Sequence, residues 1–265
     1  MADTGSPTLA IGIFCRQDTK LHANRVRFLA QQADEVIVLD LTESDIHQEI
    51  GDIVNLEYIS HPWGDSFADA RNTLIQSVNS EYALFIEADE NVGHATLRAL
   101  NQYLVEPDRD PNAITVVRID AFGEDEVPLD SSYQPRLWKM GQGIRYEGRV
   151  LEHLVSHRPI EYDYRDDIRI AHRPDDVPTG VMRDLRRLTQ RLLNQEITQG
   201  GLTGRLRYHL GLQALVDEDF DVALREFEAI IDECDDADRV SSAYVMACEC
   251  LRKMGRPADL SLIHI

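Results

Sequence analysis

Lysine is almost absent from this chain of 265 residues: Lys20, Lys139 and Lys253 are lysines, and the rest of its 27 basic residues are arginines. Acidic residues number 47, which gives a formal net charge of −20 at pH 7. A surface of this charge repels phosphate backbones and anionic lipids, so we expect neither nucleic acid nor a membrane surface as a partner. Two interpretations of the acidity stay open: a halophilic-like adaptation to concentrated salt, which screens self-repulsion, and an ordinary acidic cytosolic protein.

Long apolar runs and cysteines with metal-type spacing are also missing. No stretch approaches the ~18 apolar residues that a membrane-spanning helix needs, and the polar start of the chain does not resemble a signal peptide. The spacing of Cys15, Cys234, Cys248 and Cys250 does not match a metal site. We therefore expect reduced, structural cysteines and a cytoplasmic protein without a membrane span.

Apolar runs of strand length alternate with helical patterns in the first half of the chain. Such alternation predicts an α/β fold with a mostly parallel sheet that is covered on both faces. After residue 110 we predict a strand over 113–122, an acidic loop over 123–132 and a short strand over 168–171. The earlier predicted strands are 8–15, 35–40, 56–60 and 82–86, and the predicted helices are 24–32, 66–77 and 95–104.

Only helical patterns follow residue 181, and they contain an internal repeat. Predicted helices cover 183–195, 206–218 and 222–234, and residues between Tyr208 and Leu215 recur at an offset of 36 between Tyr244 and Leu251. The offset is close to the period of about 34 residues in tetratricopeptide (TPR) helix pairs, although a generic helical hairpin is also consistent with it. We predict two domains, an α/β domain over 1–175 and a TPR-like helical domain over 176–265.

The end of the chain indicates truncation. The second repeat has no partner helix after Arg256-Pro257, and the last six residues, Leu-Ser-Leu-Ile-His-Ile, resemble a translated sequencing adapter. We expect the natural protein to continue past about residue 259. Because stacked repeats bury one another's apolar faces, a truncated domain should expose an apolar stripe and self-associate through it. That stripe consists of Leu224, Phe227, Ile230 and Ile231.

The segment Tyr82-Ala-Leu-Phe-Ile-Glu-Ala-Asp-Glu90 predicts a ligand site. Five apolar residues of a buried strand are followed at once by three carboxylates around Ala88. Ligands of open α/β sheets bind beyond the carboxyl ends of the strands. Glu87 and Asp89 can both face one hard cation, which prefers oxygen ligands. By itself, the segment is more typical of a solvated acidic turn, and its context in the chain favours the ligand site.

Five short motifs lie in a characteristic order along the chain. They are Trp63-Gly-Asp-Ser-Phe-Ala-Asp-Ala-Arg-Asn72, Phe85-Ile-Glu-Ala-Asp-Glu90, Arg136-Leu-Trp138, Tyr146-Glu-Gly-Arg-Val-Leu-Glu152 and Ile170-Ala-His172. With them the chain resembles family 2 glycosyltransferases, in particular the branch in which a GT-A catalytic domain precedes TPR helices. The resemblance implies a GT-A (Rossmann-like) fold, a UDP- or GDP-type nucleotide-sugar donor, and metal-assisted transfer with inversion. The acceptor that the resemblance implies is a glycan, a protein or a small molecule.

The resemblance also implies which residues bind the donor. Asp40, at the end of the second strand, would contact the nucleoside, since a carboxylate accepts hydrogen bonds from ribose hydroxyls or an imide N–H. A turn residue at the end of a strand is the structural alternative for Asp40. Arg71 and Asn72 would lie on a helix near the phosphates, although Arg71 has Asp65 and Asp69 as other possible ion-pair partners.

The metal and the chemical step are assigned in the same way. Glu87 and Asp89 would hold Mn²⁺ or Mg²⁺ on the diphosphate, and the cation would stabilise the leaving group. His172 is a candidate for a further metal or phosphate contact, or a structural histidine. Glu152 is the first candidate for the general base that deprotonates the acceptor, and Glu147 is the second.

Several positions depart from the family pattern. Glu87 stands where the family has aspartate, and Leu151 replaces the histidine that precedes the glutamate at 152. If this segment is extended, His153 lies on the opposite side of the chain from Glu152. Segment 41–45 lacks the usual Thr-Gly-Ser turn, and Arg16-Gln-Asp18 stands in place of Lys-Asn-Glu.

These departures keep an alternative open: a catalytically silent relative that binds a partner protein through its TPR-like helices. A nucleotidyltransferase is a third possibility, but the chain has no Gly-rich phosphate loop near its first strand.

Overall fold

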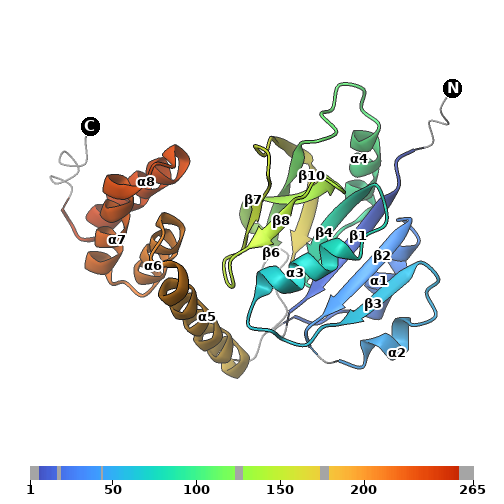
Figure 1. The fold of residues 1–265 in the computed structure, drawn as a ribbon, viewed down its shortest axis with the longest axis horizontal. Helices are drawn as coiled ribbons and strands as arrows, with labels where there is room; N and C mark the ends of the chain where they lie inside the picture. Colours follow the sequence, from blue (N-terminus) through green and yellow to red (C-terminus); the bar gives the residue numbers. More distant parts are fainter. Residues whose placement is uncertain (1–5, 17–18, 43, 123–127, 174–178, 257–265) are drawn as a thin grey trace. The chain divides into compact units, whose positions relative to one another are not determined.

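The computed structural model describes residues 6–16, 19–42, 44–122, 128–173 and 179–256 (Figure 1). Internal contacts divide the chain into two compact units, Met1–Thr189 and Gln190–Ile265. The division falls within helix α5 (Thr179–Gly200). The domain boundary predicted at residue 175 and the adapter-like tail at 260–265 both lie outside the described residues. Among the residues that are described, no helix combines the length and apolar character needed to cross a bilayer.

The first unit is built around one mixed sheet. Most neighbouring strands in it are parallel, but the strand Pro128–Lys139 runs antiparallel to both of its neighbours, and the short strand Glu90–Asn91 runs antiparallel to the strand beside it. The predicted α/β class with a mostly parallel sheet is confirmed. In the described part of the chain the strands are, in spatial order, β3 (Leu56–Ser60), β2 (Glu35–Asp40), β1 (Leu9–Cys15), β4 (Tyr82–Glu87), β7 (Pro128–Lys139), β6 (Ile114–Phe122), β10 (Tyr162–His172) and β5 (Glu90–Asn91).

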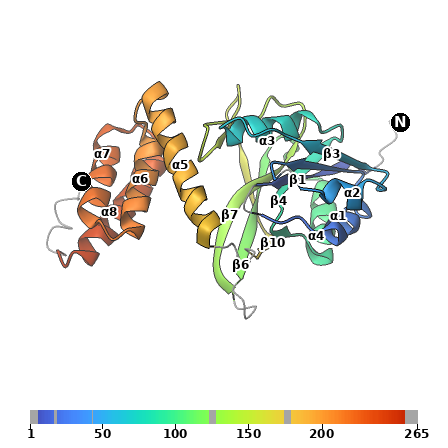
Figure 2. The same ribbon diagram turned by 90° about the horizontal axis from the view of Figure 1, so that it is seen from below.

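Helices cover both faces of this sheet. Figure 2 shows α3 (Phe67–Gln76) on one face and α1 (Ala23–Ala30) and α4 (His94–Leu104) on the other. Helix α3 begins after Ser66, whose hydroxyl accepts a hydrogen bond from the N–H of Asp69 and so caps the first turn. A short helix after β2, α2 (Ile46–Ile50), was not predicted from the sequence.

Two long strands differ from the sequence prediction, and the strands of two or three residues were not predicted. The acidic loop predicted over 123–132 is wrong from Pro128 onward, because β7 begins there and pairs with β6. A proline is tolerated as the first residue of a strand, where its missing N–H is not needed by the ladder. Strand β10 begins at Tyr162 and not at residue 168, since its charged residues obscure the apolar pattern of a strand.

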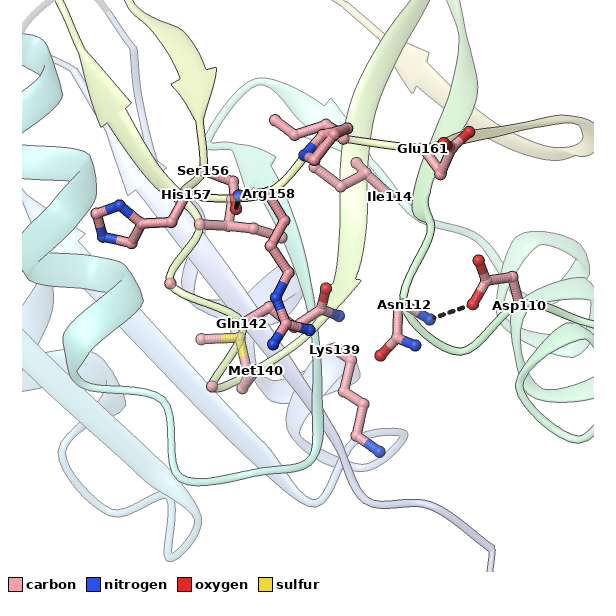
Figure 3. A pocket seen from close by; sticks show the side chains of 15 residues that line it. Asp110, Asn112, Ile114, Lys139, Met140, Gln142, Ser156, His157, Arg158 and Glu161 are labelled. Atoms are coloured by element: carbon pink, nitrogen blue, oxygen red, sulfur yellow. Dashed lines mark hydrogen bonds between the residues drawn. The ribbon is translucent and has the colours of Figure 1, made fainter.

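Two short strands, β8 (Arg145–Glu147) and β9 (His153–Val155), form an antiparallel hairpin outside the main sheet. A cavity of about 710 Å³ lies between the segments that follow β7 and β9 and the residues around the start of β6 (Figure 3). Lys139 lines this cavity and is paired in the sheet with Tyr82, the first residue of β4. The cavity therefore lies at the edge where the parallel strands begin, and we call it the amino-edge cavity.

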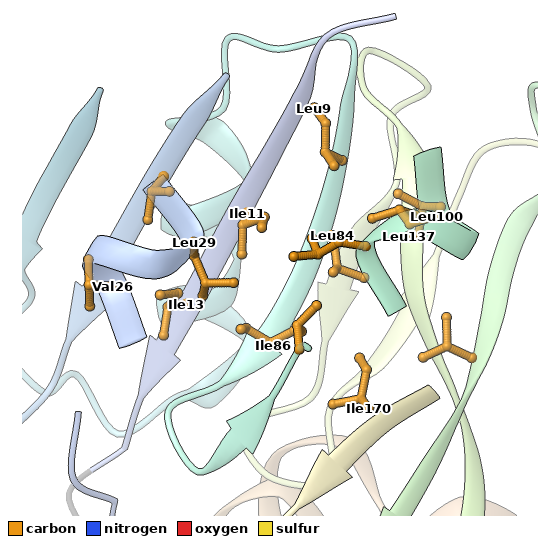
Figure 4. Close-up of a cluster of buried hydrophobic side chains, with 14 of the residues drawn as sticks. Leu9, Ile11, Ile13, Val26, Leu29, Leu84, Ile86, Leu100, Leu137 and Ile170 are labelled. Carbon is orange, nitrogen blue, oxygen red and sulfur yellow. The ribbon is translucent and has the colours of Figure 1, made fainter. Parts of the chain in front are cut away.

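Alternate residues of the central strands belong to two separate hydrophobic cores. Ile11 and Ile86 lie in one core with Leu29 of α1 (Figure 4). On the opposite face, the rings of Phe85 and Trp138 stack with their centroids 4.5 Å apart. Burial on both faces explains why β4 reads as a continuous apolar run. The first charged residue after that run marks the carboxyl edge of the sheet.

The second unit contains α6 (Gly204–Val216), α7 (Phe220–Glu233) and α8 (Ala237–Lys253). Gly211 lets α6 approach α7 closely, because a Cβ at this position would lie 2.7 Å from the ring of Phe227. Leu224, Phe227 and Ile230 of α7 are buried in a core shared with α6 and α8. The predicted exposure is therefore wrong for these three residues, because the helices on either side of α7 cover them, and Ile231 is partly buried against the same core.

Candidate functional site

Charged side chains from distant parts of the sequence gather at the carboxyl ends of β1, β2 and β4. In the parallel register, Asp40 at the end of β2 lies opposite Cys15, and Glu87 at the end of β4 lies opposite Phe14. Parallel strands end at the same edge of a sheet, which is where ligands of such sheets bind. We call the charged group at this edge the carboxyl-edge cluster; it comprises Arg16, Arg71, Glu87, Glu90, Arg136 and Glu152.

Arg71 of α3 is the junction of this cluster. Its Nε donates a hydrogen bond to Oε1 of Glu152 at 2.6 Å, and its Nη2 donates to Oε1 of Glu87. The guanidinium lies over the ring of Phe14, 4.3 Å from the centroid. The sequence alternative that paired Arg71 with an aspartate on its own helix or loop is wrong, because the side chain is buried and reaches two glutamates of other segments.

Three arginines surround the carboxylate of Glu87. Besides Arg71, Nη1 of Arg136 lies 3.7 Å from Oε1 of Glu87, and Nε of Arg16 lies 3.9 Å from Oε2. Burial alone would raise the pKa of Glu87, but the charges of Arg71, Arg136 and Arg16 lower it to about 2. Glu87 is therefore ionised at physiological pH.

Glu90 and Arg136 were not predicted as site residues. Oε1 of Glu90 accepts a hydrogen bond from Nη2 of Arg136 at 2.6 Å, and Oε2 accepts one from the backbone N–H of Glu87 at 2.8 Å. Burial raises the pKa of Glu90 above its ordinary value, although the charge of Arg136 opposes this. Both residues lie in motifs on which the resemblance rests, the Phe85–Glu90 and Arg136–Trp138 segments, and this was the signal in the sequence that could have identified them.

Asp89 and His172, both predicted to contact a metal, lie together. Oδ2 of Asp89 is 3.1 Å from Nε2 of His172, and β10 brings the histidine alongside Glu90 of β5. The hydrogen bond to Asp89 raises the pKa of His172, although partial burial opposes this. The pair thus forms a second, adjacent part of the site around the turn that follows β4.

Asp40 is buried and fully engaged within the chain. Its carboxylate accepts hydrogen bonds from the N–H of Thr42 at 2.7 Å, from the hydroxyl of Ser44 at 2.8 Å and from the hydroxyl of Tyr58 at 2.7 Å. Burial alone would raise the pKa of Asp40, but these bonds lower it below its ordinary value. The loop after β2 lacks Thr-Gly-Ser, yet Thr42 and Ser44 supply hydroxyl groups to the same carboxylate.

Of the three remaining predicted residues, Glu152 lies within the carboxyl-edge cluster, and Glu147 and Asn72 lie outside it. Glu152 joins the cluster through Arg71, whereas Glu147 pairs with Arg145 and leaves half of its side chain, 50%, exposed. Asn72 exchanges two hydrogen bonds with the backbone of Tyr146, at 2.9 and 2.8 Å, and so attaches β8 to α3. The structure therefore brings Glu152, and not Glu147, next to Glu87.

The backbone before Glu152 is bent. Leu151 has a φ of 55°, in the left-handed region that branched residues rarely adopt. The chain is thus not extended at Leu151, and strand β9 begins two residues later, at His153. Glu152 lines a small cavity of about 230 Å³, with neighbours that include Arg16 and Phe67. Such bends cost about 1–3 kcal/mol and are often found at functional sites.

The residues at this edge can be tested for their fit to a divalent cation. Within the described ranges, no group of three or more His, Cys, Asp or Glu side chains is arranged to hold a metal. Oε2 of Glu87, however, is buried and has no hydrogen-bond partner among those residues. Mg²⁺ and similar ions commonly take one or two protein carboxylates and complete their shell with water and substrate phosphates. Glu87 and Asp89 supply carboxylates of the kind that this mode of binding needs, and the arginines around Glu87 would compete with a cation for its oxygens.

Known proteins resemble this chain both in sequence and in fold. Residues 21–159, more than half of the chain, match glycosyl transferase family 2. A TPR repeat-containing protein of Synechococcus elongatus is 23% identical over 295 residues, with 94% of this chain and 72% of that protein covered. Residues 1–349 of TarS from S. aureus, solved with UDP-GlcNAc, superpose with a TM-score of 0.50 at 12% identity, covering 96% of this chain and 92% of that one. Without that ligand, the same TarS fragment gives a TM-score of 0.51 at 12% identity, covering 97% of this chain and 90% of that one. The likeness confirms the expected GT-A fold.

Proposed function

Because this chain belongs to glycosyl transferase family 2, we propose that its first unit transfers a sugar from a nucleoside diphosphate donor to an acceptor hydroxyl or thiol. The observation that carries the proposal is the shared contact of Arg71 with Glu87 and Glu152 at the carboxyl edge. Arg71 thereby connects two groups: the carboxylate of Glu87, next to the expected position of the diphosphate, and Glu152, the candidate general base. Family membership also favours sugar transfer over the nucleotidyltransferase alternative.

The donor would lie across the carboxyl ends of β1, β2 and β4. Guanidinium groups bind phosphate oxygens with two parallel hydrogen bonds, so Arg16, Arg71 and Arg136 are suited to the diphosphate. Asp40 would receive the nucleoside by exchanging one of its hydroxyl partners for a ribose hydroxyl or base N–H. TarS has been solved with UDP-GlcNAc, which supports a UDP- or GDP-type donor here.

A divalent cation, Mn²⁺ or Mg²⁺, would be held by Asp89 and Oε2 of Glu87. When bound, it would supply positive charge that stabilises the departing diphosphate. His172 would orient the Asp89 carboxylate through their hydrogen bond. The arginines around Glu87 contribute charge of the same sign at the same edge, so protein and cation would act on the same leaving group.

Glu152 would accept the proton of the acceptor hydroxyl. The acceptor oxygen then forms a bond to the anomeric carbon of the donor while the bond from that carbon to the diphosphate oxygen breaks. Attack opposite the leaving group inverts the anomeric centre. Arg71 orients the Glu152 carboxylate through its 2.6 Å hydrogen bond, and the small cavity beside Glu152 gives the acceptor a path of approach.

Incubation with a panel of UDP- and GDP-sugars, with and without Mn²⁺, tests this proposal. We expect slow hydrolysis of at least one donor, faster with Mn²⁺, since many transferases pass the sugar to water when no acceptor is present. A donor that binds but stays intact under all conditions, with every acceptor class offered, would contradict catalysis.

A catalytically silent relative remains the second candidate function. The saturated carboxylate of Asp40 and the replacement of the usual histidine by Leu151 favour it. In that case the TPR-like helices of the second unit would bind a protein partner. The predicted cytoplasmic location and halophilic-like character rest on composition and stay predictions.

A further inference from the structure

The amino-edge cavity is separate from the carboxyl-edge cluster. It is lined by Lys139, which pairs with the first residue of β4, whereas Glu87 is the last residue of that strand. The two sites therefore lie at opposite ends of the same strand. The proposed transfer reaction uses none of the residues that line this cavity.

Hydrogen-bonding groups and an apolar floor line the amino-edge cavity. The buried residues Ile114 and Ile144 line it. Gln142 and Asn112 contribute side-chain amides (Figure 3). Nε2 of Gln142 is buried and has no hydrogen-bond partner among the described residues. A buried donor without a partner is costly, and a ligand that accepts its hydrogen bond would remove the cost. Cavities of about 300–1,000 Å³ are typical of small-molecule sites, and this one is in that range.

Charges of both signs line the cavity. Lys139 and Arg158 are basic, whereas Asp110 and Glu161 are acidic. Lys139 also pairs with Glu81 at 3.2 Å, which uses part of its charge. A polyanion or a polycation would meet repulsive groups here, and the net charge of −20 disfavours a polyanion further. The lining is suited to an uncharged ligand that is rich in hydrogen-bonding groups.

Exposed tyrosines continue from the cavity along the same face of the sheet. Tyr162 pairs with Ile114 and Tyr164 with Val116, so both tyrosines share the face on which the buried Ile114 lies. Tyr162 and Tyr164 are 46% and 65% exposed. Tyr133 of β7 is 44% exposed, and its ring centroid is 6.2 Å from that of Tyr164. We call these three residues the tyrosine face.

We infer that the amino-edge cavity and the tyrosine face together bind a neutral oligosaccharide. An aromatic ring offers an apolar surface to the C–H face of a sugar ring, and amides bind the hydroxyl groups around its rim. The inference rests on the proposed function, because it identifies the acceptor class as a glycan chain that is held away from the reaction centre. The chain would be bound here along part of its length while one end is presented at the opposite edge.

Calorimetric titration with malto-, cello- and chito-oligosaccharides, beside anionic oligogalacturonates, tests the inference without any transfer reaction. We expect binding of at least one neutral series and weaker or no binding of the anionic one. Tyr164→Ala should weaken binding about tenfold, because it removes the stacking ring, whereas Tyr164→Phe should retain it. Gln142→Leu should weaken binding to a similar extent, because the amide donor is lost.

Val105→Ala is the matched control, since this exposed apolar residue follows α4 on the other face of the sheet. Failure of every neutral oligosaccharide to bind, tighter binding of the anionic series, or unchanged binding by Tyr164→Ala would overturn the inference. The outcome is separable from the proposed function. If the protein binds oligosaccharide but hydrolyses no donor, the transferase proposal fails and this site stands. If it hydrolyses a donor but binds no oligosaccharide, the transferase proposal stands and this site fails.

Discussion

At the carboxyl edge of the sheet, Arg71 and Arg136 are paired with glutamates, and only 10% and 11% of their side chains are exposed. At the amino edge, the ion pair of Lys139 with Glu81 leaves 37% and 44% of the two side chains exposed. The same strands thus connect a buried, densely paired group of charges to an open cavity of mixed polarity. The two edges differ mainly in their access to water.

This difference has energetic consequences. Charges that are removed from water interact more strongly, and their partners fix their orientation, which suits a chemical step that needs groups in set positions. Groups that remain in water gain little from pairing, and they can exchange partners when a ligand arrives. The predictions below test that contrast, beginning with the largest expected effect.

Glu152→Gln keeps the size of the side chain and its hydrogen bond from Arg71, but it removes the proton acceptor. We expect turnover to fall by roughly 10²–10⁴-fold while donor binding is nearly unchanged. The matched control is Glu147→Gln, whose side chain is half exposed and lies outside the cluster. If the Glu147 variant loses turnover and the Glu152 variant does not, the general base has been assigned to the wrong glutamate.

Arg71→Met removes the buried cation but keeps a long apolar side chain. The carboxylates of Glu87 and Glu152 would then share the site without their common partner, and the free energy of unfolding should fall by about 3–5 kcal/mol. Urea denaturation followed by circular dichroism measures the change. A loss comparable to that of an exposed pair would contradict the account of a tightly coupled cluster.

Protonation of Glu87 gives a pH-dependent test. Its pKa is lowered from 4.5 to about 2 in the folded protein, so its contribution to stability is present above 4.5 and is lost as pH falls through the folded value. The free energy of unfolding of wild type minus that of Glu87→Gln should therefore shrink by roughly 3 kcal/mol from neutral to strongly acid pH. The pKa of Glu90 is raised partly by the charge of Glu87, so it should be lower in Glu87→Gln than in the wild type. A difference that does not change with pH would contradict this assignment.

Lys139→Met breaks the ion pair at the other edge. Because both side chains are exposed, the free energy of unfolding should change by less than about 1 kcal/mol. The same urea titration, run beside Arg71→Met, compares the two edges directly. A loss as large as that of the buried arginine would remove the contrast between them.

The central strands were predictable because a strand that is buried on both faces has a continuous run of apolar residues. β2 has the bounds expected from its apolar run, and β4 ends at the first charged residue, Glu87. β7 and β10 were missed or shortened because an exposed face places tyrosines and charges within the strand. Apolar runs identify strands buried on both faces, whereas strands with one face in water need an alternation that these sequences obscure.

The sequence predicted which residues belong to the site better than it predicted which of them contact one another. The resemblance named Glu87, Asp89 and Glu152, and the fold brings two of these onto one arginine. That Arg71 selects Glu87 and Glu152 over nearby aspartates depends on the packing of α3 against the sheet, which no local pattern contains. The amino-edge cavity is formed by segments around residues 110, 140 and 158, and nothing in any one of them indicates that they meet.

The most direct measurement is a calorimetric titration of UDP and of GDP, with and without Mn²⁺, into the wild type and Asp89→Asn, with a thermal melt of both proteins. We predict binding that strengthens with Mn²⁺ and is severely weakened by Asp89→Asn. The melting temperature should change little, because asparagine keeps the size of the side chain and can still hydrogen-bond to His172. Tight nucleotide binding that ignores both Mn²⁺ and the substitution, or an Asp89→Asn protein that is destabilised with its binding unchanged, would contradict a donor site at the carboxyl edge.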